Sequence, residues 1–477
     1  MSDVAPIQSR VARAAAWSGL STIVLRLGGL VVGIVLARIL TPEQFGVYAV
    51  ALTVQGILMT VADLGLSADL IRSKEPEKIA PTVATLGLIS GAVMTVITLT
   101  GSTALATILG SPEAAPAISV LGFTLLLAGA TVVPFGMLQR RFQQRELFFV
   151  GVVDFVVSTV VTLTLVFLGF GVLGLAIGRV AAQVASSGMQ FAFARVVPSY
   201  GIDRKAVVPV LAFGLPIAAA NLLSWGLLNA DNIILVRIAG ATALGYYVLA
   251  FNISSWPMSA LSQVVRSISL PYFSRTDAHK DGLATLTSIA WAGALPAGAV
   301  LAALSAPLIE VVYGAKWLPA APVLAALGLY GGLRVVFDIF AGYLYARGRS
   351  RPVLWVQLLW LVVVVAGMIF ATSAYGIVGA AWVHVAAAVV VILPAYLVVL
   401  QRAGVQVASI LRAAVWPTIG ALPATAAALL ANLFITNALG ALLVGGFAAL
   451  AVYVITMWPW ARRRLREYRR SGEGDAQ

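Results

Sequence analysis

The chain has 477 residues, of which 61% are hydrophobic and 10% are charged. A soluble domain carries roughly 25% charged residues, so a chain of this composition could not cover a water-facing surface and is predicted to lie in a membrane. The formal net charge of +13 does not indicate nucleic-acid binding here, because the basic residues fall between apolar runs, and the absence of cysteine excludes disulfides, thiol nucleophiles and thiolate metal sites.

Apolar runs of about twenty residues recur along the whole chain, and each is long enough to cross about 30 Å of hydrocarbon as an α-helix. Membrane strands would instead show segments of about ten residues with alternating polarity, and the sequence has no such pattern. We therefore predict an all-α integral membrane protein with about fourteen transmembrane helices. In chain order, these helices cover residues 14–40, 45–70, 80–109, 115–138, 148–169, 172–194, 207–238, 243–270, 284–312, 319–346, 353–374, 376–401, 410–433 and 438–460.

The distribution of Lys and Arg predicts which side of the membrane each connection faces. With the N-terminus placed in the cytoplasm, every even-numbered connection is basic, and no odd-numbered one has more than a single cation. Cytoplasmic loops carry an excess of Lys and Arg, so this alternation predicts an even number of spans with both termini in the cytoplasm. The basic tail from Arg462 to Arg470 is interpreted as an anchor beside anionic headgroups rather than as a partner-binding patch.

The chain also repeats itself at an offset near 200 residues. Residues 36–39 match residues 235–238, and residues 171–174 match residues 376–379. Two repeats of six helices in the same orientation are related by an axis along the membrane normal, and they form two lobes with a cleft between them. The predicted domains are an N-terminal lobe of residues 1–200, a C-terminal lobe of residues 201–404, and residues 405–477 with two extra helices and the basic cytoplasmic tail.

Polar side chains inside the predicted helices are candidates for a substrate site. An ionisable residue at mid-bilayer costs at least about 2.5–3.5 kcal/mol, so each needs a partner or a water-filled cavity. Helical spacing aligns these residues in stripes that both lobes would turn toward the cleft. Arginine binds phosphate through its planar, multi-donor fork, and a tryptophan can stack on a sugar. The substrate-binding candidates are Arg26, Arg179, Arg334, Asn221, Trp225, Asn229 and Gln183.

The alternative interpretation is that these charges neutralise one another. Arg334 and Asp338 stand four residues apart on one helix face, and the other carboxylates in the spans could pair with the remaining arginines. The candidates for charge pairing or ion coupling are Asp63, Asp154, Asp231, Asp338 and His384. For His384, satisfied packing is favoured over proton coupling.

Catalytic motifs are absent from the sequence. It has no G-x-x-x-x-G-K-[ST] loop for ATP, no H-E-x-x-H, and no cluster of acids, Cys or His at metal-ligand spacing. No segment outside the predicted spans is long enough to fold as a catalytic domain. We therefore expect no catalytic residue, no metal site and no cofactor, and a transport or scaffold role is favoured over an enzyme.

The ends of the first two spans carry a specific pattern. Residues 36–48 read LARILTPEQFGVY, and residues 62–67 read ADLGLS. This pattern resembles the polysaccharide transport (Wzx-type) flippase branch of the multidrug/oligosaccharidyl-lipid/polysaccharide (MOP) exporter superfamily, and the arrangement of six, six and two spans is similar to that family's layout. The resemblance implies a flippase that moves a polyprenyl-diphosphate-linked oligosaccharide across the bacterial cytoplasmic membrane by alternating access, for cell-surface polysaccharide biosynthesis.

The same resemblance implies a role for cationic residues in the cavity, where Arg26, Arg179 and Arg334 would hold the diphosphate. The implied partners are the lipid-linked oligosaccharide, membrane lipids, and a polysaccharide polymerase and glycosyltransferases of the same pathway; no nucleic acid is expected. Three alternatives stay open. They are a lipid II-type flippase with the same span count, a cation-coupled multidrug exporter, which usually has twelve spans, and a membrane scaffold without transport.

Overall fold

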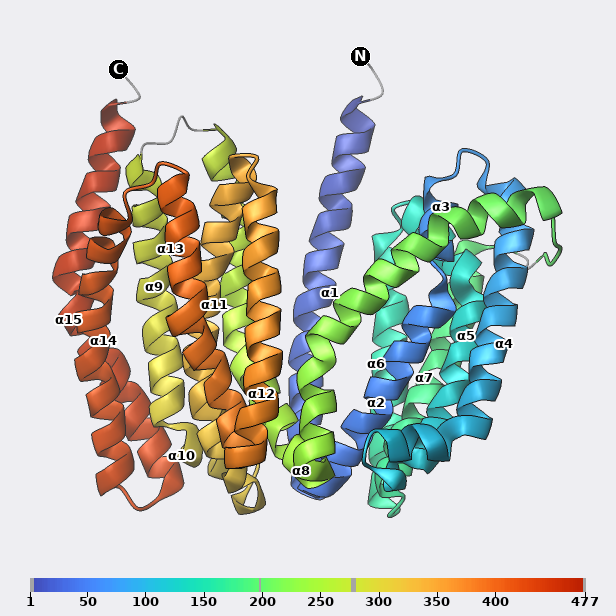
Figure 1. Ribbon diagram of the computed structural model, residues 1–477, viewed down its shortest axis with the longest axis horizontal. Coiled ribbons are helices and arrows are strands. Elements are labelled where there is room, and N and C mark those ends of the chain that lie inside the picture. The colour runs from blue at the N-terminus through green and yellow to red at the C-terminus, as the bar shows by residue number, and fades with distance from the viewer. Residues whose placement is uncertain (1–3, 197–198, 276–279, 475–477) are drawn as a thin grey trace. The chain divides into compact units, whose positions relative to one another are not determined.

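The computed structural model describes residues 4–196, 199–275 and 280–474 (Figure 1). Within these ranges every regular element is a helix, which confirms the predicted all-α class. The elements are α1 (Val4–Ile39), α2 (Pro42–Asp63), α3 (Leu66–Arg72), α4 (Pro76–Ile108), η1 (Pro112–Ala114), α5 (Ala115–Arg140), α6 (Gln144–Phe167), α7 (Gly171–Ala194), α8 (Arg204–Arg275), α9 (Lys280–Ala303), α10 (Ser305–Val312), η2 (Ala315–Ala320), α11 (Ala321–Ala346), α12 (Ser350–Ala387), the π-helix η3 (Ala388–Ile392), α13 (Leu393–Arg402), α14 (Val407–Phe434) and α15 (Ala438–Gly474).

Two helical stretches, α8 and the run of α12, η3 and α13, each contain a pair of membrane spans joined at a glycine. The backbone leaves the helical region at Gly240 in α8 (φ 83°, ψ 174°) and at Gly376 in α12 (φ 60°, ψ −150°). As one straight helix, the 72 residues of α8 would extend about 108 Å, more than three times the hydrocarbon thickness. Among the described residues, eleven helical stretches are long and apolar enough to cross a membrane. Counting each of these two stretches twice gives thirteen, and the 36-residue α1 brings the total to the predicted fourteen.

The chain divides into two compact units, Met1–Gly245 and Tyr246–Gln477. In the first unit α4 packs beside α5, α6 beside α7, and α1 along α6 (Figure 1). In the second unit α9 packs between α11 and α14, and α15 packs on α14. The first segment of α8 belongs to the first unit, with Val210 in a core cluster that includes Leu66 and Leu70 of α3. The division of the sequence into lobes of residues 1–200 and 201–404 stays a prediction.

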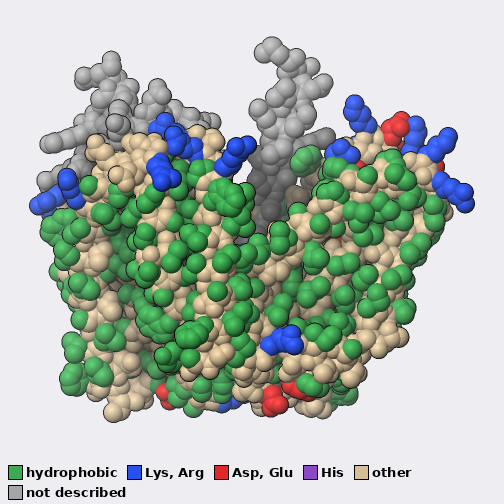
Figure 2. Space-filling model, in the orientation of Figure 1, with side chains coloured by type: hydrophobic (Ala, Val, Ile, Leu, Met, Phe, Trp, Pro, Cys, Tyr) green, Lys and Arg blue, Asp and Glu red, His purple; other side chains and the backbone are tan. Residues whose placement is uncertain are grey.

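The flanks of both units are covered with apolar side chains. Large hydrophobic side chains are highly exposed on them, including Val208 and Ile455 at 71% exposure and Phe370 at 74%. Figure 2 shows that most of the visible Lys and Arg side chains of each unit gather at one end of its helices, away from these flanks. A soluble protein rarely exposes contiguous apolar surface on this scale, so the flanks fit hydrocarbon. Of the basic tail, the side chains beyond residue 463 lie outside the described residues.

Corresponding helix pairs in the two units make the same close contact. In the α4–α5 pair, a Cβ added at Gly129 would lie 2.2 Å from the Gly87 carbonyl oxygen. In the α9–α11 pair, a Cβ added at Gly298 would lie 2.5 Å from the Gly328 carbonyl oxygen. Small residues let membrane helices approach to backbone contact. These pairs are the third and fourth spans of each predicted six-helix repeat. The two repeats are therefore similar in the packing of these helices as well as in sequence.

The residues that open α2 form a complete helix start. Thr41 is the N-cap, and its Oγ1 accepts a hydrogen bond from the Gln44 backbone N–H at 3.2 Å, while the Gln44 side chain accepts from the Thr41 N–H at 3.0 Å. Pro42 stands at the first helical position, where its missing N–H costs nothing. One turn later, Gly46 touches the backbone that follows Gly240. The T-P-x-Q-F-G stretch is therefore a capping box followed by a contact glycine.

We predict that Gly46→Ala strongly destabilises the fold, because its Cβ would lie 1.7 Å from the Ala241 carbonyl oxygen. Backbone cannot yield as a side chain would, and overpacking typically costs about 1–3 kcal/mol. Thermal unfolding in lipid nanodiscs should show a clearly lowered midpoint. The matched control is Gly446→Ala, where a Cβ meets nothing within 4 Å; equal midpoints for the two variants would contradict this interpretation.

The structure differs from the sequence prediction at the end of the second span. Residues 45–70 were expected to form one helix, but α2 ends at Asp63 and the short α3 begins at Leu66. Both residues between them are left-handed, with φ 46° at Leu64 and 66° at Gly65. The apolar run continues through the break, so hydrophobicity alone could not reveal it. The predicted span 284–312 is likewise divided, between α9 and α10 at Leu304.

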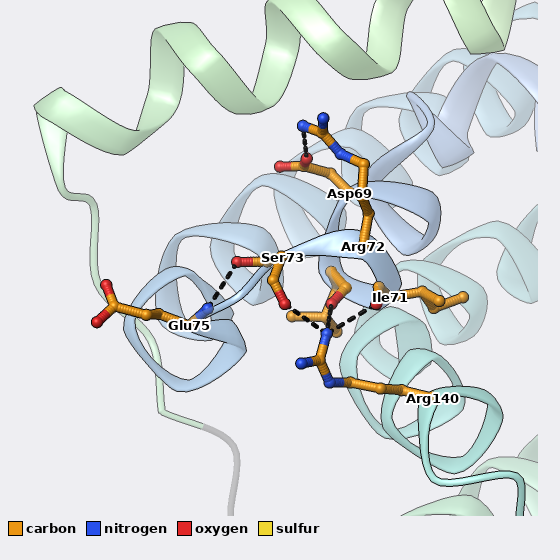
Figure 3. A network of polar contacts seen from close by, with 7 residues as sticks. Asp69, Ile71, Arg72, Ser73, Glu75 and Arg140 are labelled. Atoms are coloured by element: carbon orange, nitrogen blue, oxygen red, sulfur yellow. Dashed lines mark hydrogen bonds and ion pairs between the residues drawn. The ribbon is translucent and has the colours of Figure 1, made fainter. Parts of the chain in front are cut away.

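Arginines at the end of α5 complete the hydrogen bonding of other helices. Figure 3 shows Arg140 pointing at the last carbonyls of α3, where its Nη1 donates to Ile71 O at 2.7 Å, to Leu70 O at 3.4 Å and to Ser73 O. Arg141 donates to Ala194 O at 2.8 Å, at the end of α7. The second unit has the same device, since Arg349 donates to Arg402 O at 3.1 Å, at the end of α13. A cation at a helix C-terminus binds carbonyls that have no partner within the helix.

We predict that Arg140→Ala loosens α3 without unfolding the first unit. Hydrogen bonds from a charged donor contribute about 1.5–3 kcal/mol, and this substitution removes the donor that three carbonyls share. Amide hydrogen exchange over residues 66–73 should become faster, while exchange in α7 stays as it is. Arg204→Ala removes the same charge from an exposed residue and serves as control. Unchanged exchange in α3 after Arg140→Ala would show that this cap is dispensable.

Candidate functional site

A cavity of about 650 Å³ lies inside the first unit, among apolar helices. We call it the Asp154 cavity. It is bordered mainly by α1, α6 and α7, with Tyr48 from α2 and Phe135 from α5. Its polar or small lining residues are Gly29, Gly33, Tyr48, Gly151, Asp154, Ser158, Thr159, Thr162, Arg179, Gln183, Ser186 and Gln190. Three of the candidates predicted from the sequence, Asp154, Arg179 and Gln183, therefore meet in one space.

An ion pair crosses this cavity from α7 to α6. Arg179 Nη1 donates to Asp154 Oδ2 at 2.9 Å, and Ser186 Oγ donates to Asp154 Oδ1 at 3.3 Å. The two charged side chains keep 37% and 29% of their surface exposed. Asp154 and Arg179 thus pair with each other in the structure, and both residues border the cavity. Pairing and substrate contact are compatible roles for this arginine.

Close packing of α6 on α7 places the pair. A Cβ added at Gly178 would lie 2.0 Å from the Thr162 hydroxyl oxygen, and one at Gly174 would lie 3.0 Å from the Leu165 Cβ. With the helices this near, the residue after Gly178 faces Asp154 across the seam. Gln183 and Ser186 follow Arg179 at helical spacing and continue the polar face. The buried Gln190 Oε1 ends it, with no hydrogen-bond partner among the described residues.

A second cavity, of about 480 Å³, lies between α2, α5 and the first segment of α8. We call it the Asp63 cavity. Its polar lining residues are Thr60, Asp63, Asn221, Ser224 and Trp225, and its apolar ones include Met59, Val132 and Leu228. Three of the predicted candidates, Asp63, Asn221 and Trp225, therefore come together here. They do so in a different cavity from Arg179.

The remaining candidates lie elsewhere in the structure. Arg26 is exposed on α1, and Asn229 donates to the Trp225 carbonyl of its own helix at 2.9 Å. Asp231 also lies on α8, where its Oδ1 accepts from the Asn232 N–H at 3.1 Å. In the second unit, Arg334 and Asp338 are half-buried on α11, and His384 is buried on α12. Whether Arg26 and Arg334 act with Arg179 stays a prediction.

The second unit carries aromatic rings where the first carries its ion pair. The repeat sets Asp154 against Trp360 at an offset of 206, and Arg179 against His384 at an offset of 205. In the structure the Tyr330 ring contacts both of these residues, at centroid distances of 6.2 Å and 5.2 Å. His384 is buried, and its Nδ1 lies 3.1 Å from the Ala380 carbonyl oxygen. The two repeats share a backbone plan but differ in chemistry at this position.

Thr60 and Ser224 are lining residues that sequence reasoning missed. Each hydroxyl donates to the carbonyl four residues earlier, Thr60 to Gly56 O and Ser224 to Ala220 O, both at 2.8 Å. Hydroxyls bonded in this way occur throughout membrane helices, so the residue type carries no signal of a cavity. Only the packing of α2 against α8 shows which of them face one. Among the described residues, no group of three or more His, Cys, Asp or Glu could hold a metal ion.

Comparison with known proteins settles the family. Residues 35–322, more than half of the chain, match the family described as "Polysaccharide biosynthesis protein". The chain belongs to this family. It is 28% identical over 357 residues to lipopolysaccharide biosynthesis protein WzxC of Escherichia coli (strain K12), covering 72% of this chain and 71% of that protein. It is 27% identical over 327 residues to succinoglycan biosynthesis transport protein ExoT of Rhizobium meliloti (strain 1021), covering 67% and 66%.

The fold of this family member also occurs in a solved transporter structure. Lipid II flippase MurJ in an inward closed conformation superposes with a TM-score of 0.75, over 94% of this chain and 100% of that one. At 14% identity, this likeness concerns the fold alone. The family and its relatives make the chain a multi-pass membrane transport protein of polysaccharide biosynthesis rather than an enzyme. The predicted resemblance to polysaccharide transport (Wzx-type) proteins is confirmed.

We predict that Asp154 and Arg179 are energetically coupled. A double-mutant cycle with Asp154→Asn and Arg179→Gln should give a coupling free energy within about 0.5–3 kcal/mol, toward the lower end because both side chains are about a third exposed. Either single variant should unfold more readily than the double one, since each leaves a charge unpaired within the membrane. Chemical unfolding in mixed micelles measures this.

The control for this cycle is the pair Lys78–Glu75, which has a similar distance, 2.8 Å, but side chains that are 73% and 65% exposed. Exposed pairs of this kind contribute about 0–1 kcal/mol. If the coupling free energy of Asp154 and Arg179 does not exceed that of the control, the membrane setting gives the pair no special strength.

Proposed function

We propose that this protein moves a polyprenyl-diphosphate-linked oligosaccharide from the inner to the outer leaflet of the bacterial cytoplasmic membrane, by alternating access. The single observation that carries the proposal is the Asp154 cavity. It is a space of about 650 Å³ with an arginine on its wall, inside a unit whose outer surface is apolar. Membership of a polysaccharide biosynthesis family supports the choice of a glycan as cargo.

Arg179 is suited to hold the diphosphate. A guanidinium has five N–H donors in a planar fork, and the contact with Asp154 occupies Nη1. A phosphate entering the cavity would meet the remaining donors and compete with the carboxylate. Asp154 keeps the hydrogen bond from Ser186 in that case. The carboxylate thus neutralises the arginine while the cavity is empty, when an unpaired cation would cost at least about 2.5–3.5 kcal/mol.

The location and orientation follow from the charge pattern. The basic connections face the cytoplasm under the positive-inside rule, which places both termini there. The headgroup would then enter from the cytoplasm, while the polyprenyl chain stays in lipid beside the apolar flanks. Glycosyltransferases would supply the lipid-linked glycan, and a polymerase would consume it on the other side.

We predict that Arg179→Ala lowers translocation of the lipid-linked glycan at least about tenfold, because losing 1.4 kcal/mol of headgroup binding is a factor of ten. The assay is leaflet exposure of the labelled glycan in inverted membrane vesicles, at matched protein levels. Arg179→Lys should retain part of the activity, since it keeps the charge but not the fork. The control Arg237→Ala removes an exposed arginine that borders neither cavity.

Parallel Arg26→Ala and Arg334→Ala variants test the other two cations. Full translocation in all three alanine variants would overturn the role assigned to the cavity. Lost drug resistance with intact glycan export would instead indicate a multidrug exporter. Lost translocation of a peptidoglycan precursor alone would indicate a lipid II-type flippase.

A further inference from the structure

The Asp63 cavity has an architecture of its own, which begins at the break between α2 and α3. Leu64 holds a left-handed conformation (φ 46°) without being glycine, at a cost of about 1–3 kcal/mol. The break ends α2 at Asp63, and its carboxylate accepts a hydrogen bond from Ser67 Oγ at 3.3 Å. A continuous helix would avoid this backbone strain. The strained break is therefore the feature that ends α2 at Asp63 and lets Ser67 hold its carboxylate.

Contact with α8 fixes what faces this carboxylate. A Cβ added at Gly214 would lie 2.1 Å from the Leu64 carbonyl oxygen, so α8 crosses the break at backbone distance. Residues seven and eleven positions further along a helix share the same face. Those residues are Asn221 and Trp225, and both line the cavity. The crossing at Gly214 therefore aims an amide and an indole at the space beside Asp63.

The polar groups of this cavity suit hydroxyls rather than phosphate. Among the described residues, its lining contains one carboxylate and no Lys or Arg. A carboxylate accepts hydrogen bonds and does not donate, whereas an amide such as that of Asn221 does both. The hydroxyls of Thr60 and Ser224 donate to their own helices and so offer oxygens as acceptors. An anion would meet repulsion here, while a neutral polyol would find acceptors and a donor.

The apolar groups of the cavity suit a ring. The indole of Trp225 lies over Gly56, where a Cβ would come within 2.6 Å of its Nε1 and Cζ2. Glycine at this position makes room for the indole against α2, and Trp225 also lines the cavity, so an aromatic ring forms part of its wall. Aromatic rings offer a large, rigid apolar face. The volume of about 480 Å³ falls within the range of about 300–1,000 Å³ that small-molecule sites occupy.

We propose that the Asp63 cavity binds a neutral sugar ring, with Trp225 packed on its apolar face and Asp63 and Asn221 hydrogen-bonded to its hydroxyls. The proposal deepens the proposed function, on which it rests for the identity of the sugar as part of the transported glycan. The cavity differs from the Asp154 cavity in both helices and charge. The carboxylate makes the site selective, because a uronic acid would place a second negative charge beside Asp63.

The test uses the natural absence of cysteine from this chain. Leu228→Cys places a reporter on the cavity lining, and Leu223→Cys places a control on the same helix outside it; the two leucines are 71% and 65% exposed. Purified full-length protein in nanodiscs is labelled with a water-soluble maleimide. The probes are methyl α-glucopyranoside, N-acetylglucosamine, glucuronic acid, inorganic phosphate and sodium chloride, each titrated separately.

We expect a neutral sugar at about ten times its Kd to slow labelling of Leu228→Cys about tenfold, with Leu223→Cys unaffected. Glucuronic acid, phosphate and sodium should protect far less. Adding Asp63→Asn or Trp225→Ala should abolish protection, and Trp225→Phe should keep part of it. Asp203→Asn, on the loop before α8, is the control for a lost carboxylate.

Three results would overturn the proposal: no neutral sugar protects the reporter, protection survives Trp225→Ala, or phosphate or sodium protects as well as sugar. If Asp63→Asn fails to fold, the selectivity series on the reporter alone still decides. The outcome is separable from that of the proposed function. Sugar protection together with full translocation in Arg179→Ala would refute the role of the arginine alone, and lost translocation without sugar protection would refute this site alone.

Discussion

A backbone amide or carbonyl without a partner in hydrocarbon costs several kcal/mol, and the arrangement of this chain follows from avoiding that cost wherever a helix stops. Within a helix the backbone groups hydrogen-bond to one another, so the groups without a partner are those at the helix ends. At the start of α2, Thr41 and Gln44 exchange hydrogen bonds. At the ends of α3, α7 and α13, Arg140, Arg141 and Arg349 donate to the last carbonyls. Arginines of the connections from which the orientation is predicted therefore also bind the last carbonyls of helices.

The same constraint governs charged side chains. In the first unit Asp154 and Arg179 satisfy each other across a cavity, with Ser186 as a further donor. In the second unit the matching positions hold Trp360 and His384, which pack against the Tyr330 ring. The two repeats thus share the arrangement of their helices but differ in the side chains at these matching positions. The carboxylate of Asp154 thus holds Arg179 on the cavity wall while 37% of the arginine side chain stays exposed.

Close backbone contacts at glycines also constrain how the helices pack. Glycines at matched sites join α4 to α5 in one unit and α9 to α11 in the other. Gly46 meets the chain after Gly240, and Gly214 meets the break at Leu64. Each crossing fixes which face of a helix turns inward, and hence which polar residues line a cavity. The two cavities therefore follow from the way the helices cross.

The sequence by itself determined the class, the fourteen spans and the family resemblance, because hydropathy and short motifs are local properties. Its basic loops and helical spacing also predicted an orientation and the polar stripes. It also identified Asp154 and Arg179 as possible partners. It could not reveal the break at Leu64, since the apolar pattern runs through it, or show that Asp63 and Trp225 share a cavity apart from Arg179. Those facts depend on which helices touch, and only contacts between distant segments such as Gly65 and Gly214 decide that.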